Sequence, residues 1–119
     1  MNTSPISFGS YRSPLKSYYK KGFLDVTWGI YGERLNKKTV SLEHLLPKAL
    51  GGKNILSNYA LADRFINEQR GTKPLSLYVT PQNAIKYIAQ FIGIKLPNFD
   101  GNEYVKGIIE TLRELKIFT

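Results

Sequence analysis

The sequence predicts an α+β domain in which a short β-hairpin and a helix precede two amphipathic helices. Residues 39–45 alternate between residue types and are rich in strand formers, and residues 58–62 indicate a second strand that pairs back. Residues 80–119 carry apolar side chains at helical spacing. The chain of 119 residues is long enough for one hydrophobic core and too short for two ordinary domains. We therefore expect a single domain over residues 1–119.

Turn-forming and capping residues bound the predicted hairpin and its helix. Pro47 should end the first strand, because proline donates no hydrogen bond to a strand partner. A polar loop over residues 48–57 then leads to the second strand. Asp63 is expected to open a helix over residues 64–70, and Gly71 suits the C-terminal end of that helix.

Residues 76–119 are expected to form a C-terminal helical extension. Thr80 followed by Pro81 is typical of the start of a helix, and Gly93 is expected to stop that helix. Residues 96–101 turn the chain into a second helix. Both helices are expected to turn an apolar face toward the core, with a dimer interface as the alternative. The apolar positions of the first helix are Ala84, Ile85, Ile88, Ala89 and Ile92, and those of the second are Val105, Ile108, Ile109, Leu112 and Leu115.

The N-terminal third gives weaker signals. Residues 1–22 are rich in Ser, Tyr and Lys without a clear period, so we expect an irregular basic and aromatic arm. Its tyrosines and lysines could stack on bases or bind a nucleic-acid backbone, although core packing or disorder is favoured. Residues 23–35 fit a short helix and a turn equally well.

The positive charge is concentrated in the first part of the chain. There are 17 Lys and Arg against 9 Asp and Glu, a formal net charge of +8. Residues 1–75 contain 12 basic and 5 acidic residues, whereas residues 76–119 contain 5 and 4. Such asymmetry favours a partner with a phosphate backbone, because neutralised phosphates release condensed counterions. A charge that only maintains solubility accounts for the composition equally well.

Composition also excludes several classes of protein. The chain has no Cys, which removes disulfides, thiolate zinc sites and cysteine nucleophiles. No apolar run approaches the roughly 20 residues that span a bilayer, so no membrane association is expected. The start of the chain, residues 1–5, lacks the basic-then-apolar pattern of a signal peptide. We expect a soluble cytoplasmic protein that is not secreted.

One constellation of side chains points to chemistry. His44 is the only histidine, and a lone histidine is more often structural than catalytic. Here a carboxylate, Glu43, precedes it directly. Asn58 follows 14 positions later and Asn67 a further 9 positions on. This combination favours a functional interpretation of His44.

The residues around this constellation resemble the motif of the HNH endonucleases, which have the ββα-metal fold. The resemblance covers residues 23–75, and its final Asn is similar to that in the HNH domain of RNA-guided CRISPR nucleases. It implies a ββα-metal core over residues 23–75. The segments that carry the resemblance are Glu43-His44-Leu45-Leu46-Pro47, Gly51-Gly52, Asn58-Tyr59-Ala60-Leu61 and Asn67-Glu68-Gln69-Arg70-Gly71.

The resemblance implies a role for each of four residues. Glu43 and Asn67 would be metal ligands, and their oxygen atoms suit Mg²⁺ or Mn²⁺ rather than zinc. His44 would be the general base that activates water, since imidazole titrates near neutral pH. Asn58 would bond across the loop and hold the histidine-bearing segment. The family usually has Asp where this chain has Glu43, and often His where it has Asn67.

Many members of the family brace the fold with a zinc knuckle made of two Cys-x-x-Cys pairs. Residues 28–32 lie where the first pair would fall, and Asp63 and Ile66 lie where the second would fall. We expect no structural zinc. Packing of Trp28 and Tyr31, partly against Ile66, is expected to replace it, because buried aromatic side chains contribute a large apolar area.

Basic residues near the motif are candidates for binding nucleic acid. Arg70 and Lys73 follow Asn67 closely and could contact phosphate, which an arginine can bind in a bidentate manner. Lys48 and Lys53 flank the Gly-Gly loop and could contact the DNA backbone. A solvated surface role accounts for all four side chains as readily.

The resemblance implies a metal-dependent hydrolase of phosphodiester bonds that acts on DNA, with duplex DNA as the first expectation. One active site cuts one strand, so a monomer would nick and a double-strand break would need a homodimer or two encounters. A phage or mobile-element origin, with a complex partner and the host-cell cytoplasm as location, fits a chain of this size. Two alternatives stay open: a DNA- or RNA-binding module that no longer cuts, and a complex subunit that docks through an apolar stripe on residues 102–116.

Overall fold

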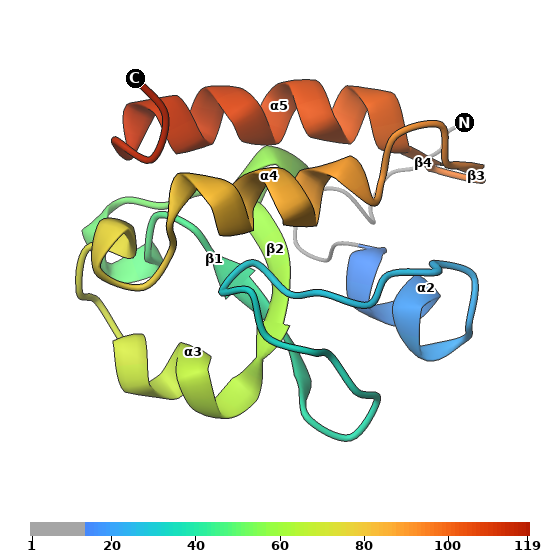
Figure 1. The fold of residues 1–119 in the computed structure, drawn as a ribbon, viewed down its shortest axis with the longest axis horizontal. Coiled ribbons are helices and arrows are strands. Elements are labelled where there is room, and N and C mark those ends of the chain that lie inside the picture. The colour runs from blue at the N-terminus through green and yellow to red at the C-terminus, as the bar shows by residue number, and fades with distance from the viewer. Residues whose placement is uncertain (1–13) are drawn as a thin grey trace.

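A two-stranded antiparallel hairpin and the helix after it form the centre of the fold in the computed structural model, which describes residues 14–119 (Figure 1). The hairpin pairs β1 with β2 so that His44 lies opposite Tyr59 and Val40 opposite Asp63. The predicted order of strand, strand and helix is confirmed, as is the α+β class. The bounds are β1 Val40–His44, β2 Tyr59–Asp63 and α3 Arg64–Arg70.

The capping residues predicted for α3 occupy the expected places. The Asp63 side chain accepts hydrogen bonds from the backbone N–H groups of Phe65 and Ile66, at 3.0 and 3.1 Å. Gly71 ends the helix with a φ of 56°, a value that disfavours residues with a Cβ atom. The loop between the strands contains two short 3-10 turns, η1 (Lys48–Leu50) and η2 (Leu56–Asn58).

Two C-terminal helices cover the hairpin on the side away from α3 (Figure 1). The Thr80 hydroxyl caps the first of them by accepting from the backbone of Asn83 at 3.1 Å, as predicted. A small hairpin joins the two helices in place of the expected simple turn. A further 3-10 turn, η3, precedes the first of the two helices. The bounds are η3 Leu75–Leu77, α4 Pro81–Ala89, β3 Lys95–Leu96, β4 Phe99–Asp100 and α5 Gly101–Glu114.

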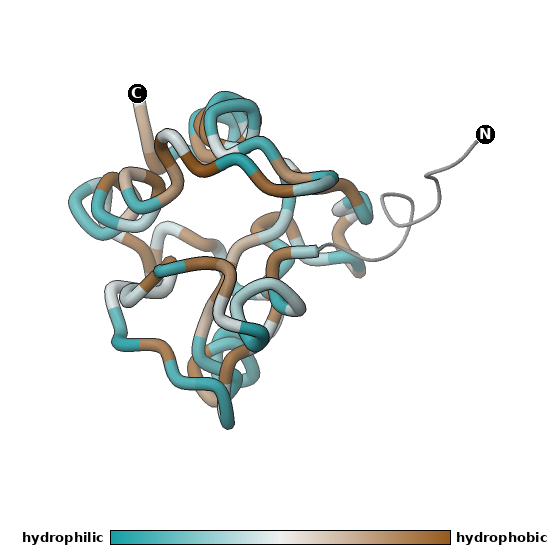
Figure 2. Tube along the Cα trace, turned by 90° about the vertical axis from the view of Figure 1, so that its right-hand side faces the viewer, coloured by the Kyte–Doolittle hydropathy of each residue, from teal (hydrophilic) through white to brown (hydrophobic). Residues whose placement is uncertain are grey.

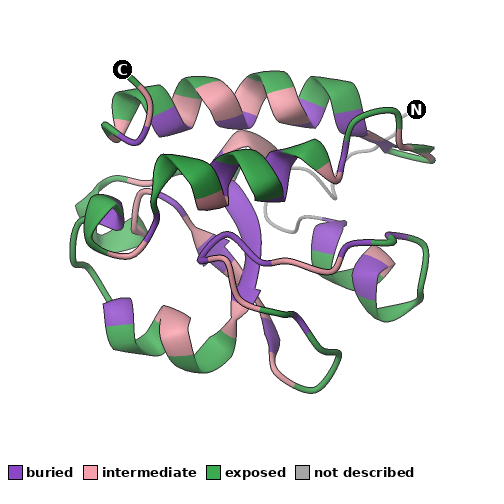
Figure 3. Ribbon diagram, in the orientation of Figure 1, coloured by how far each residue is buried: buried purple, intermediate pink, exposed green. Residues whose placement is uncertain are grey.

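The apolar faces of the two helices agree only partly with the prediction. Helix α4 ends at Ala89, before Gly93, and Ile85 and Ile92 are 55% and 64% exposed. The expectation that both isoleucines face the core is therefore wrong. In α5, Ile108 and Leu112 are fully buried as expected. Its outer side is exposed, whereas β2 is buried along most of its length (Figure 3).

Buried tyrosine hydroxyls attach both helices to the outer edge of β2. Tyr104 of α5 donates to the carbonyl of Tyr59 at 2.6 Å, and its oxygen lies 2.8 Å from the hydroxyl of Tyr87 in α4. Tyr87 in turn accepts from the backbone N–H of Leu61 at 2.9 Å. The carbonyl of Leu61 accepts from Ile30 at 3.0 Å. These side chains and the 28–34 turn thus satisfy strand groups that would otherwise be unpaired.

Replacing Tyr104 with phenylalanine is expected to lower the free energy of unfolding by about 1–3 kcal/mol, because the carbonyl of Tyr59 and the Tyr87 hydroxyl lose a buried partner. Urea denaturation measures the change. Tyr78→Phe is the matched control, since the Tyr78 ring is half-buried against Tyr31. Equal stabilities of the two variants would contradict this account of the β2 edge.

The N-terminal region differs from the expected irregular arm. Residues 15–20 form a helix, α2 (Leu15–Lys20), and Leu15 and Tyr19 lie in the core. The Tyr18 hydroxyl donates to the carbonyl of Pro97, so α2 contacts the β3–β4 hairpin. Residues 1–13 of the arm, including Tyr11 and Arg12, lie outside the described residues.

Residues 23–35 form a turn rather than a helix. An isolated bridge pairs Trp28 with Arg34, and a hydrogen bond of 2.8 Å joins the N–H of Gly29 to the carbonyl of Glu33.

Within residues 14–119, no helix is long and apolar enough to cross a membrane. Figure 2 shows hydrophobic and hydrophilic residues interspersed along the described part of the chain.

Candidate functional site

The candidate residues converge where β1 ends beside α3. Because neighbouring strand residues face opposite sides, Glu43 and His44 enter different surroundings. Glu43 contacts Asn67 and Arg70, which come from α3. His44 contacts Asn54 of the loop between the strands. The site is therefore built from one strand, one helix and one loop.

The carboxylate of Glu43 is almost fully buried, with 4% of the residue exposed. Its Oε2 atom lies 3.1 Å from Nη1 of Arg70 and accepts a hydrogen bond from the Tyr31 hydroxyl. Burial raises the pKa of Glu43 to about 7, although the positive charge of Arg70 acts in the opposite direction. The contacts with Arg70 and with the Tyr31 hydroxyl both involve Oε2, and neither involves Oε1.

Asn67 places its side-chain amide directly against Glu43. With its nitrogen toward the carboxylate, it donates to Oε1 at 2.6 Å and Oε2 at 2.9 Å, and its oxygen accepts from the Ser41 hydroxyl at 3.1 Å. Rotation of the amide by 180° would turn its oxygen toward Glu43. The two predicted metal ligands, separated by 24 positions, are thus neighbours.

Arg70 differs from its predicted place on the surface. It is 1% exposed and uses its guanidinium inside the protein, so the expected phosphate contact is wrong. Nη2 donates to the carbonyl of Leu45 at 2.8 Å, and Nη1 donates to that of His44 at 3.2 Å as well as to Glu43. Nε donates to the carbonyl of Lys73 at 2.9 Å. Arg70 therefore ties the end of α3 to the end of β1.

His44 as a residue is partly exposed to solvent. Its Nε2 atom lies 2.8 Å from Oδ1 of Asn54. The ring packs edge-on against Tyr59, with the ring centroids 4.8 Å apart. Position 44 is therefore not sealed inside the protein.

Asn58 spans the loop in the manner the resemblance implied. Its Oδ1 accepts from the backbone N–H of Leu46 at 2.9 Å, and its Nδ2 donates to the carbonyls of Leu46 and Lys53 at 3.0 Å each. It is 5% exposed. A Cβ atom at Gly52 would lie 1.8 Å from the carbonyl oxygen of Leu46, so only glycine permits this close approach of the loop.

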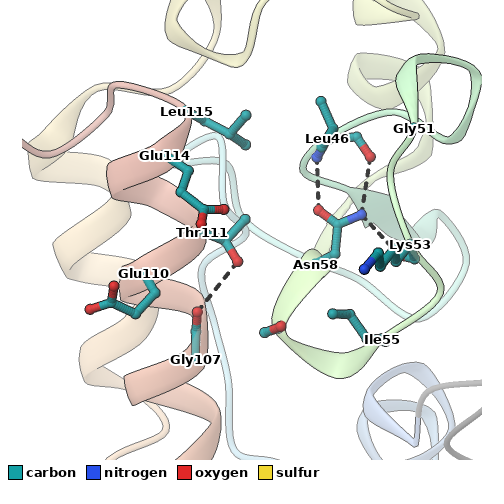
Figure 4. A pocket seen from close by; sticks show the side chains of 11 residues that line it. Leu46, Gly51, Lys53, Ile55, Asn58, Gly107, Glu110, Thr111, Glu114 and Leu115 are labelled. Carbon is teal, nitrogen blue, oxygen red and sulfur yellow. Dashed lines mark hydrogen bonds between the residues drawn. The ribbon is translucent and has the colours of Figure 1, made fainter.

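A cavity of about 570 Å³ opens behind the loop, between it and α5 (Figure 4). Asn58 and Lys53 line it on one side, and Thr111 and Glu114 line it on the other. His44 and Glu43 are not among its lining residues, so this cavity adjoins the candidate site only through Asn58 and Lys53.

Three of the four predicted nucleic-acid-binding side chains lie on the surface. Lys48 and Lys53 are exposed on the loop that also supplies Asn54. Lys73 is exposed just after α3, and its Nζ donates to the carbonyl of Gln69 at 2.9 Å. The fourth is the buried Arg70.

The turn predicted to replace a zinc knuckle is held by polar as well as aromatic contacts. Tyr31 is buried, but Trp28 is half-buried and its ring lies under Lys86, with Nζ 3.6 Å from the ring centroid. The Glu33 carboxylate accepts from the backbone N–H groups of Tyr31 at 3.0 Å and Asp63 at 2.7 Å. This carboxylate joins the two segments that Cys pairs would join, and sequence analysis assigned it no role.

The donor set at Glu43 and Asn67 fits a hard divalent cation. Oε1 of Glu43 and the amide oxygen of a rotated Asn67 would supply two oxygen ligands, and Mg²⁺ commonly completes its shell with water and substrate phosphate. Within residues 14–119, no three His, Cys, Asp or Glu side chains cluster in the manner of a metal site.

Comparisons of the chain with protein-family models, with curated proteins and with solved structures find no match. The function must therefore be argued from the contacts of this site.

The raised pKa of Glu43 predicts a pH dependence of stability in metal-free buffer. Native Glu43 holds its proton up to about pH 7, whereas the unfolded chain releases it near pH 4.5. Because the native state binds more protons across this window, its stability relative to Glu43→Gln should fall as pH rises from 4.5 to 7. The expected change is on the order of 2 kcal/mol. Denaturant titrations of both proteins measure it, and a pH-independent difference would contradict it.

Proposed function

We propose that this protein is a metal-dependent DNA endonuclease of the HNH type, with the ββα-metal core at residues 23–75. The observation that carries the proposal is the contact between Glu43 on β1 and Asn67 on α3, with the partly exposed His44 next along the strand. Metal-assisted phosphodiester hydrolysis needs a base and a cation held by oxygen ligands, and adjacent positions at the end of β1 supply the candidate base and one candidate ligand here.

His44 acts as the general base in this proposal. Its unprotonated ring nitrogen takes a proton from water, the water oxygen bonds to phosphorus, and the bond from phosphorus to the 3′-oxygen breaks. The leaving oxygen takes a proton from solvent, which gives 5′-phosphate and 3′-hydroxyl ends. Asn58 holds Leu46 and Lys53 together, so it keeps the segment after His44 against the loop.

Glu43 and Asn67 would hold the cation, as Mg²⁺ or Mn²⁺. When bound, the cation would polarise the scissile phosphate and stabilise the charge that develops on the leaving oxygen. Arg70 and the Tyr31 hydroxyl fix Oε2 of Glu43 and so orient the other oxygen toward Asn67. Zinc has no thiolate or second imidazole here, which makes it the weaker candidate.

Duplex DNA is the proposed substrate. Lys48 and Lys53 are exposed on the loop whose Asn54 touches His44, and Lys73 is exposed beyond α3. The +7 charge of residues 1–75 would attract the phosphate backbone. A single site per chain would cut one strand, so the monomer would act as a nickase and a homodimer could break both strands.

Incubation with supercoiled plasmid tests the proposal. The expected product is relaxed circular DNA in Mg²⁺ or Mn²⁺ and unchanged supercoiled DNA in EDTA, because the cation is required for phosphate activation. Gel electrophoresis over a time course measures the rate. Binding to the plasmid without cleavage in either metal would contradict an endonuclease.

A non-cleaving nucleic-acid-binding protein is the second candidate, and one observation favours it. Arg70 already pairs a positive charge with the Glu43 carboxylate and the Tyr31 hydroxyl donates a hydrogen bond to it, which reduces its need for a cation. Retention of plasmid in a gel-shift assay without nicking is its expected result. An exposed apolar stripe on residues 102–116 would favour the complex-subunit alternative, but Ile108 and Leu112 of that face of α5 are buried.

A further inference from the structure

Asn54 is the loop side chain that hydrogen-bonds the imidazole of His44, and the proposed function gives it no task. Its Oδ1 lies 2.8 Å from Nε2 of the ring, and both residues are partly buried. With Oδ1 of Asn54 toward the ring, the amide accepts the hydrogen bond and Nε2 is the nitrogen that carries the proton. The other ring nitrogen, Nδ1, then keeps its lone pair.

The plane of the ring is fixed by a second contact. Tyr59, directly opposite His44 in the hairpin, packs edge-on against the imidazole with an interplanar angle of 63°. The tyrosine limits rotation of the ring, and Asn54 distinguishes its two nitrogens. Together they define which edge of His44 is free to meet a water molecule.

Asn58 determines where Asn54 lies. Its Nδ2 donates to the carbonyl of Lys53, the residue directly before Asn54, and to that of Leu46, two residues after His44. One buried amide thus fixes the spacing between the two chain segments that carry the hydrogen-bonded pair. The absence of a side chain at Gly52 allows these segments to approach.

We propose that Asn54 is a positioning residue that holds His44 in the Nε2-protonated tautomer and leaves Nδ1 as the proton acceptor. The use of Nδ1 in catalysis rests on the proposed function, whereas the tautomer does not. Which nitrogen of a histidine is protonated is generally decided by the hydrogen bond at the other nitrogen.

The single histidine makes the tautomer directly measurable. Long-range ¹H–¹⁵N correlation spectra of ¹⁵N-labelled protein, recorded without metal at pH 8, contain one imidazole. The wild-type ring is expected to show Nε2 protonated and Nδ1 unprotonated. In Asn54→Ala the two ¹⁵N shifts should move toward each other, as the second tautomer becomes populated.

Two further variants separate positioning from loss of structure. Asn54→Asp keeps an acceptor oxygen and should retain the wild-type tautomer. Asn102→Ala removes an amide that accepts from Gly93 at the other end of the fold, and it should leave the imidazole signals unchanged. In plasmid nicking, Asn54→Ala should lower kcat by about tenfold or more without raising KM, and Asn54→Asp should restore most of the rate.

The outcomes distinguish this proposal from the proposed function. A wild-type ring protonated at Nδ1, or a tautomer unchanged in Asn54→Ala, overturns the placement of Asn54 whether or not the protein cuts DNA. The expected spectra from a protein that nicks no plasmid support the tautomer and count against the endonuclease.

Discussion

Replacing His44 with alanine is expected to slow the nicking of supercoiled plasmid by about 100-fold or more, which is the effect of removing a general base. The variant should still bind plasmid, because the exposed lysines on the loop are unchanged. It should also fold, since His44 is only half-buried and lies at the end of β1. Initial rates of relaxed-circle formation in Mg²⁺ measure the effect.

Asn102→Ala is the matched control for this experiment, because it removes an exposed polar side chain at the start of α5. Its nicking rate should equal that of the wild type. A His44→Ala protein with wild-type activity would show that another group activates the water. The wild type in EDTA gives the background rate from which the loss is measured.

Replacing Arg70 with methionine is expected to lower the free energy of unfolding by about 3–5 kcal/mol, the cost of leaving a buried charge without its partner. The substitution removes the guanidinium from the Glu43 carboxylate. It also removes a hydrogen bond from each of the carbonyls of His44, Leu45 and Lys73. Urea denaturation at pH 8, where Glu43 of the wild type is ionised, measures the loss.

A surface ion pair supplies the control for Arg70. Arg113 is exposed and pairs with Glu110 one helical turn earlier at 2.8 Å, so Arg113→Met should change stability by less than about 1 kcal/mol. Combining Arg70→Met with Glu43→Gln should recover part of the loss, because no unpaired carboxylate is then buried. Equal losses in the single and double variants would mean that the ion pair contributes little.

Local signals were sufficient to predict most helices and both central strands. Asp63, Gly71 and Thr80 cap helices where their residue types indicated, because capping depends on neighbouring backbone groups alone. Helix α2 was missed, since only Leu15 and Tyr19 of its short sequence face the core.

The buried face of α4 was misjudged for a physical reason. The buried positions in and just after this helix include Tyr87 and Phe91, whereas the prediction counted only aliphatic residues and so included Ile85. The Tyr87 hydroxyl reaches Leu61 of β2, and aromatic rings pack around Phe91. Aliphatic spacing alone could not identify which side of the helix makes these contacts.

The motif was sufficient to predict which two residues meet at the site. It did not predict which side chains of the site are buried. The proximity of Glu43 and Asn67 followed from the resemblance. The inward turn of Arg70 did not, because a basic residue at the end of a short helix is usually exposed. Asn54 and Glu33 gave no sequence signal, since their partners are a side chain and backbone groups that only folding brings near.

The covered outer edge of β2 has a consequence for self-association. An uncovered edge strand can recruit a strand from another molecule and so promote aggregation or domain swapping. Here hydroxyl groups of Tyr87 and Tyr104 and the backbone of Ile30 already occupy groups on that edge. A dimer of this protein could not extend the sheet at β2 without dislodging α4 and α5.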